Sequence, residues 1–117
     1  MMNIPLRREL VATARKMSES GLTGGTSGNV SVRVEGGLLI TPSGLPYDDM
    51  GIEDLCELSS DGKPRSFGLE PSTEWRIHCD IYRTRPEVKA IVHAHPMFAT
   101  TLSILTTPPP SRSHPQP

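Results

Sequence analysis

Hydrophobic residues recur at helical spacing at the start of the chain and at strand spacing after it. The first apolar set shares one face of a helix and comprises Leu6, Leu10, Val11, Ala14 and Met17. We expect this helix to end near residues 20–21, where a glycine suits the position after a helix. Valines then alternate with polar residues over 30–34, and three apolar residues followed by a threonine make up residues 38–41. A glycine turn separates the two runs, so they predict an antiparallel hairpin whose first strand has one buried face.

The rest of the pattern predicts a mixture of strands and helices. Residues 52–58 are compatible with another strand, and Pro71-Ser72-Thr73-Glu74 should open a helix that continues to about residue 85, because Pro86 stops it. Residues 90–95 form an apolar run that predicts a buried strand, and residues 97–105 can form a last helix. Residues 106–117 are rich in proline and lack periodicity, so we divide the chain into a folded part, 1–105, and a disordered tail, 106–117.

Two histidines end the apolar run of residues 90–95. In a strand, residues i and i+2 point to the same face, so His93 and His95 should project side by side. Two imidazoles on one rigid strand can chelate zinc or another divalent metal. The alternative for the pair alone is two histidines that only hydrogen-bond to neighbours, and the choice depends on the rest of the chain.

Three further segments carry polar groups suited to an anionic substrate. Gly25-Thr26-Ser27-Gly28-Asn29 offers backbone N–H groups and an amide, and Thr41-Pro42-Ser43-Gly44 adds a hydroxyl at a strand end. Ser72-Thr73-Glu74 lies at a predicted helix start, where free N–H groups attract anions. Each segment also has a purely structural explanation as a turn or a helix cap. We expect His78, one turn after Glu74, to be packed and hydrogen-bonded rather than a ligand.

Composition and charge exclude several classes of protein. The formal net charge is −1, which provides no basic surface for nucleic acid, and no apolar run reaches the ~20 residues of a membrane helix. The N-terminus lacks the apolar core of a signal peptide. Cys56 and Cys79 have no metal-ligand spacing and are expected to be small buried residues. Together these features predict a cytoplasmic protein with no membrane or nucleic-acid partner.

In order and spacing, the four motifs resemble those of the class II aldolase/adducin family. The matching segments are residues 25–33, 39–44, 71–78 and 92–95, and the likeness runs from about residue 6 to residue 105. The resemblance implies an α/β fold, an α/β/α layered domain around a mostly antiparallel sheet, of which this chain would be the N-terminal half. It also implies a homotetramer with active sites at subunit interfaces.

The resemblance further implies a role for each matching residue. The phosphate of a sugar-phosphate substrate would be held by Gly28, Asn29, Ser43, Gly44, Ser72 and Thr73. Glu74 would be the catalytic acid/base and is also counted among the candidate metal ligands, with His93 and His95. The implied activity is zinc-dependent cleavage of a ketose 1-phosphate to dihydroxyacetone phosphate and an aldehyde.

Family members are considerably longer than this chain. A third metal-binding histidine, later strands and a catalytic tyrosine would all follow residue 105, where the likeness stops. We therefore expect a truncated or frame-shifted product, poorly folded and inactive as given. The alternatives are an epimerase or dehydratase of the same family, or a non-catalytic fragment or binding module. Retention of Glu74, His93 and His95 argues against a non-catalytic module.

Overall fold

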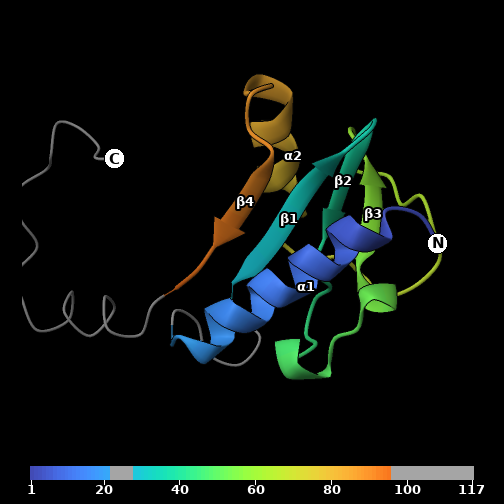
Figure 1. The fold of residues 1–117 in the computed structure, drawn as a ribbon. Helices are drawn as coiled ribbons and strands as arrows, with labels where there is room; N and C mark the ends of the chain where they lie inside the picture. The colour runs from blue at the N-terminus through green and yellow to red at the C-terminus, as the bar shows by residue number, and fades with distance from the viewer. Residues whose placement is uncertain (22–27, 96–117) are drawn as a thin grey trace, which may run out of the picture.

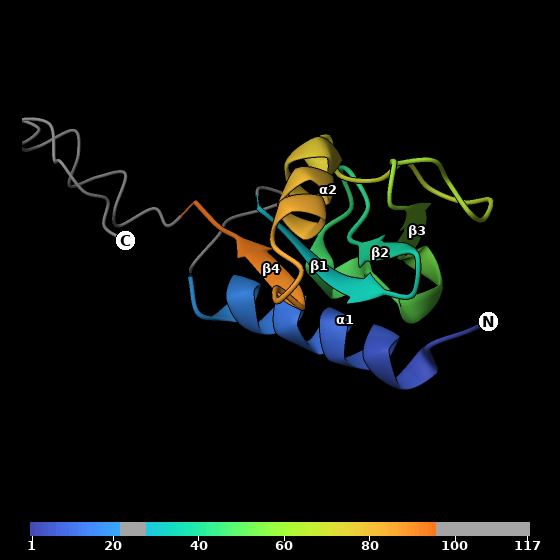
Figure 2. The same ribbon diagram turned by 90° about the horizontal axis from the view of Figure 1, so that it is seen from above.

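The computed structural model describes residues 1–21 and 28–95, which form a four-stranded sheet between two helices. The order of elements is α1 (Ile4–Glu19), β1 (Asn29–Val34), β2 (Gly37–Ile40), the 3₁₀ turns η1 (Tyr47–Asp49) and η2 (Ile52–Asp54), β3 (Cys56–Ser59), α2 (Trp75–Thr84) and β4 (Ala90–His93). The strand order is β3-β2-β1-β4, and all pairs are antiparallel. Helices α1 and α2 cover opposite faces of the sheet (Figures 1 and 2). The predicted α/β/α layered fold is therefore confirmed.

The sheet has a separate hydrophobic core on each face. Because side chains alternate along a strand, Leu39 packs toward α1, whereas Leu38 and Ile40 pack toward α2. All three side chains are essentially fully buried. The α1 core also contains the apolar face of α1 that the sequence predicts, and the α2 core contains both cysteines, which are buried free thiols. In the part of the chain that the structure describes, no helix is long and apolar enough to span a membrane.

Strand β1 departs from the prediction of one buried face. Val30 is buried against α1, as expected, but Ser31 on the opposite face is completely buried as well. The reason is that α2 covers the second face of the sheet, and Ser31 is hydrogen-bonded beneath this helix. A serine within a strand of alternating valines can therefore mark a polar contact inside a core.

Two predicted boundaries and one predicted burial are corrected by the structure. Residues 52–54 form η2 instead of a strand, because the Asp54 carboxylate accepts a hydrogen bond from the Gly51 N–H and closes a tight turn. Helix α2 begins at Trp75 instead of Ser72, and Ser72-Thr73-Glu74 form the turn before it. Strand β4 is not buried, because it lies at one edge of the sheet that the described residues form, where Val92 is 53% exposed. The predicted helix 97–105 and the tail 106–117 lie outside the described residues.

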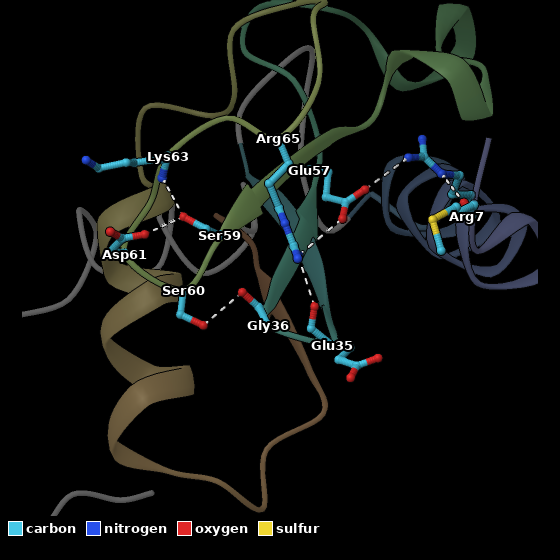
Figure 3. Close-up of polar contacts among 10 residues, drawn as sticks. Arg7, Glu35, Gly36, Glu57, Ser59, Ser60, Asp61, Lys63 and Arg65 are labelled. Atoms are coloured by element: carbon cyan, nitrogen blue, oxygen red, sulfur yellow. Dashed lines mark hydrogen bonds and ion pairs between the residues drawn. The ribbon is translucent and has the colours of Figure 1, made fainter.

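At the edge of the sheet opposite β4, ion pairs and hydrogen bonds of charged side chains connect strand β3 to helix α1. Glu57 on β3 forms ion pairs with Arg65, at 3.2 Å, and with the buried Arg7 of α1, at 3.8 Å (Figure 3). Arg7 also donates a hydrogen bond to the Ile52 carbonyl, and Arg65 donates one to the Glu35 carbonyl. These contacts connect α1, the β1–β2 turn and β3, and they stabilise the edge of the sheet that lies opposite β4.

Candidate functional site

A carboxylate and two imidazoles converge where α2 begins and β4 ends. Glu74 immediately precedes α2, His93 is the last residue of β4, and His95 follows two residues later. One ligand atom from each residue lies within 4.8 Å of the others. Glu74 Oε1 is 2.7 Å from His93 Nδ1, and the centroids of the two imidazole rings are 4.6 Å apart. The expected side-by-side placement of His93 and His95 is thus what the structure shows, although His95 lies beyond the end of the strand.

The chemistry of these donors fits a divalent cation. Two imidazole nitrogens and a carboxylate oxygen form a donor set that zinc accepts readily. The side chains of His93 and Glu74 are 32% and 35% exposed, so the cluster is partly open, as a catalytic metal site must be. We take Glu74, His93 and His95 as the residues that would hold the ion.

Asn29 fixes the Glu74 carboxylate and keeps it ionised. Its Nδ2 donates a hydrogen bond of 2.6 Å to Glu74 Oε1, and it is the direct cross-strand partner of His93. This hydrogen bond is the main cause of the lowered pKa of Glu74. Partial desolvation opposes the lowering, and the adjacent His93 contributes to it. An ionised carboxylate can ligate a metal or take up a proton.

A polar pocket of about 340 Å³ opens beside the cluster. Its walls include every residue to which the family resemblance gives a role in phosphate binding, namely Gly28, Asn29, Ser43, Gly44, Ser72 and Thr73. Glu74 and His95 line the same pocket, so the candidate phosphate site and metal site are continuous. Residues 25–27 of the predicted glycine-rich loop lie outside the described residues.

Backbone contacts bring two distant segments together to build this pocket. Pro42 and Pro71 form an isolated antiparallel bridge, with hydrogen bonds from Ser72 N to Thr41 O, at 3.0 Å, and from Ser43 N to Glu70 O, at 2.9 Å. Gly44 has φ of +73°, a left-handed conformation that glycine adopts without strain. Ser43 and Gly44 form the turn, and Ser43 is exposed on the pocket wall.

The hydroxyl groups around the pocket are not equivalent. Ser72 is buried, and its Oγ accepts a hydrogen bond of 3.2 Å from the Glu74 N–H, so it stabilises the turn before α2. Ser43 and Thr73 are exposed. They are the side chains most free to reorient toward an anion.

His78 is packed and hydrogen-bonded, as expected, and it reveals partners that the sequence did not. It is 1% exposed, with Nε2 at 2.5 Å from Asn29 Oδ1 and Nδ1 at 2.6 Å from Ser31 Oγ. Burial is the main reason that its pKa falls to about 4. Ser31 also contacts the Tyr82 hydroxyl at 2.8 Å. The only sequence signal for Ser31 was its polar side chain between valines.

Comparisons with known proteins agree with the motifs. A family described as the Class II Aldolase and Adducin N-terminal domain matches residues 8–116. The 5-methylthioribulose-1-phosphate/5-deoxyribulose-1-phosphate aldolase of an Escherichia coli strain is 44% identical over 104 residues, which are 89% of this chain and 48% of that protein. An L-fuculose phosphate aldolase of Haemophilus influenzae is 43% identical over 106 residues, which are 91% of this chain and 49% of that protein. The chain thus spans about half the length of the curated relatives it matches.

Solved structures show the same relationship. An L-fuculose 1-phosphate aldolase superposes with a TM-score of 0.81 at 34% identity, covering 90% of this chain and 50% of the other. An L-fuculose-1-phosphate aldolase from Thermus thermophilus superposes with a TM-score of 0.68 at 36% identity, covering 80% and 48%. The motifs of this chain also resemble those of L-fuculose-1-phosphate aldolases within the family. Sequence, fold and the arrangement of the motifs agree, and the chain belongs to the class II aldolase and adducin family.

Proposed function

We propose that this protein is a metal-dependent aldolase that cleaves a ketose 1-phosphate to dihydroxyacetone phosphate and an aldehyde. The observation that carries the proposal is the continuity of the two candidate sites: Glu74 and His95 belong both to the metal-ligating cluster and to the wall of the phosphate pocket. A substrate with its phosphate in this pocket has its carbonyl end directed toward an ionised carboxylate and two imidazoles. Names of relatives such as L-fuculose phosphate aldolase support a phosphorylated sugar as the substrate.

The side chains described above divide the work between binding and proton transfer. Ser43, Thr73 and the backbone at Gly44 would hold the phosphate, which positions the rest of the substrate at the cluster. Zinc or another divalent ion held by His93 and His95, with Glu74, would supply Lewis-acid stabilisation of the negative charge that develops on the substrate oxygens.

Glu74 would carry a proton to and from the substrate carbon next to the carbonyl. The hydrogen bonds from Asn29 and His93 both reach Oε1, so Oε2 is the oxygen available to exchange a proton. The lowered pKa keeps Glu74 ionised near neutral pH. Glu74 can therefore remove a proton from dihydroxyacetone phosphate in the synthetic direction and return it during cleavage. We further propose a homotetramer, on the basis of the family resemblance, and a cytoplasmic location, on the basis of the composition and the two free cysteines.

Equilibrium binding of zinc and dihydroxyacetone phosphate tests this function, because it reports on the groups described here and does not require turnover. Calorimetric titration should show one zinc per chain and tighter binding of dihydroxyacetone phosphate when zinc is present. Thr73→Val should weaken dihydroxyacetone phosphate binding, whereas Thr84→Val, the same change at the far end of α2, should not. Equal binding of the phosphate compound with and without zinc, or equal effects of the two variants, would overturn the proposal.

A further inference from the structure

A chain of five hydrogen-bonded side chains runs from the α2 core to the candidate metal cluster. It begins at the Tyr82 hydroxyl, 2.8 Å from Ser31 Oγ, which is 2.6 Å from His78 Nδ1. His78 Nε2 is 2.5 Å from Asn29 Oδ1, and Asn29 Nδ2 is 2.6 Å from Glu74 Oε1. The first four members are at most 6% exposed, so the hydrogen-bonded chain is buried until it reaches Glu74.

The chemistry of the last link sets the direction of every other link. An ionised carboxylate only accepts hydrogen bonds, so the NH₂ group of Asn29 must face Glu74 and its carbonyl oxygen must face His78. His78 Nε2 must then carry the proton, which leaves Nδ1 to accept from the Ser31 hydroxyl. Ser31 in turn accepts from the Tyr82 hydroxyl. All four hydrogen bonds therefore donate toward Glu74, and bonds aligned in this way polarise one another.

The environment of His78 maintains this arrangement. A doubly protonated imidazole would present a donor to both Asn29 and Ser31, which breaks the direction of the chain. Burial prevents that state near neutral pH, because it lowers the pKa of His78 to about 4. The neutral ring can fill its role with one donor and one acceptor, and the structure supplies a partner for each.

We propose that His78 is a positioning residue for the metal and proton-transfer site: its Nε2–H orients the Asn29 amide, and the amide holds the Glu74 carboxylate against His93. The proposal rests on the function proposed above. His78 does not line the pocket, and its hydrogen-bonded route to Glu74 runs through Asn29. Hydrogen-bond partners behind a metal ligand typically change metal affinity or activity by about 10- to 100-fold when removed.

The first test measures the tautomer of His78 in the metal-free wild-type protein. Long-range ¹H–¹⁵N NMR correlations of the imidazole distinguish a proton on Nε2 from one on Nδ1, and comparison with His78→Gln identifies the signals. We expect His78 to carry its proton on Nε2 alone. A proton on Nδ1, or a mixture of tautomers, would overturn the proposal. This readout requires neither zinc nor turnover.

The second test separates positioning from a general contribution to folding. His78→Leu removes both hydrogen bonds at similar volume and should weaken zinc binding about 10- to 100-fold. His78→Gln should recover most of this loss, because the glutamine amide can again donate to Asn29. Cys79→Ala is the control, because Cys79 is as buried on α2 as His78 but is not part of the series of hydrogen-bonded side chains. This substitution should leave zinc affinity unchanged.

The outcomes of the two tests are distinct. Folded His78→Leu protein with wild-type zinc affinity, or equal losses in the Leu and Gln variants, would overturn the positioning role. If His78→Leu does not fold, the Gln variant and the wild-type tautomer decide the question. Wild-type protein that binds no zinc would overturn the proposed metal function, and the tautomer would still show whether the chain donates toward Glu74.

Discussion

Asn29 on β1 and His93 on β4 are directly opposite each other in the antiparallel sheet. Their side chains meet at Glu74, whose Oε1 accepts a hydrogen bond of 2.6 Å from Asn29 Nδ2 and lies 2.7 Å from His93 Nδ1. The candidate site therefore depends on the register between these two strands. A shift of one residue would turn His93 to the other face of the sheet and leave Glu74 without this partner.

In a version of the protein that has the full length of its relatives, Glu74→Gln should abolish proton transfer while the cluster still binds zinc through the histidines. Glutamine keeps the shape of the side chain but cannot take up a proton, and such groups contribute about 10²- to 10⁴-fold to rate. The measurement is exchange of the carbon-bound proton of dihydroxyacetone phosphate with deuterium, followed by NMR with zinc present. Glu87→Gln, at an exposed ion pair with Arg85, is the matched control. Loss of zinc from the Glu74 variant would instead make Glu74 primarily a metal ligand.

Ser43→Ala should weaken the binding of inorganic phosphate by about 10- to 150-fold, because one hydrogen bond to a charged group contributes roughly 1.5–3 kcal/mol. Ser43 is exposed on the pocket wall and has a hydroxyl free to turn toward an anion. Phosphate titrations followed by NMR chemical shifts provide the measurement. Ser66→Ala, at an exposed serine outside this pocket, should bind phosphate as the wild type does. Equal affinities in all three proteins would place the phosphate elsewhere.

Arg33→Lys should lower the free energy of unfolding by about 2 kcal/mol. The Arg33 guanidinium donates to the carbonyls of Val88, Tyr82 and Arg85 and lies 4.7 Å from the centre of the Tyr82 ring. These contacts bind Arg33 to the last turn of α2 and to the segment that connects α2 with β4. A lysine ammonium cannot make the same set of hydrogen bonds, because it lacks the planar, forked shape of the guanidinium. Urea denaturation gives the value.

The control for this substitution is Arg85→Lys. Its side chain forms an exposed ion pair with Glu87, so we expect a change of no more than about 0.5 kcal/mol. A loss at Arg33 as small as the loss at Arg85 would show that the carbonyl contacts contribute little to stability.

Protein stability should fall between pH 6.5 and pH 5 because of His78. The pKa of His78 is about 4 in the folded protein, compared with 6.5 for a histidine in the unfolded chain. Between pH 6.5 and pH 5 the unfolded chain therefore binds a proton that the folded protein does not. Stability therefore rises with pH through this window, and His78 alone accounts for a loss of about 2 kcal/mol between pH 6.5 and pH 5.

Urea denaturation at several pH values measures this dependence. His78→Gln cannot titrate, so its stability should change less over the same window. The lowered pKa of Glu74 adds a separate loss only at lower pH, as the carboxylate becomes protonated. A His78→Gln variant with the full pH dependence of the wild type would show that other groups cause it.

The sequence determined the elements and the chemistry that each one carries. Helix α1 and the β1–β2 hairpin follow from short-range periodicity, and strand periodicity predicts the side-by-side placement of His93 and His95, although His95 lies just beyond β4. The order of the four motifs was enough to indicate the family, which the comparisons confirm. These features depend on residues close together in the chain, where backbone geometry alone decides which side chains share a face.

Only the tertiary structure decided which distant residues meet. The bridge between Pro42 and Pro71 joins two walls of the pocket, and the β1–β4 register places Asn29 beside His93. The buried contacts of Ser31 with His78 and Tyr82 exist because α2 packs across β1, which the alternation of valines did not indicate. Such contacts depend on how whole helices and strands pack against one another. This packing is determined by the burial of apolar residues from many parts of the chain in both cores, so a local sequence pattern does not encode it.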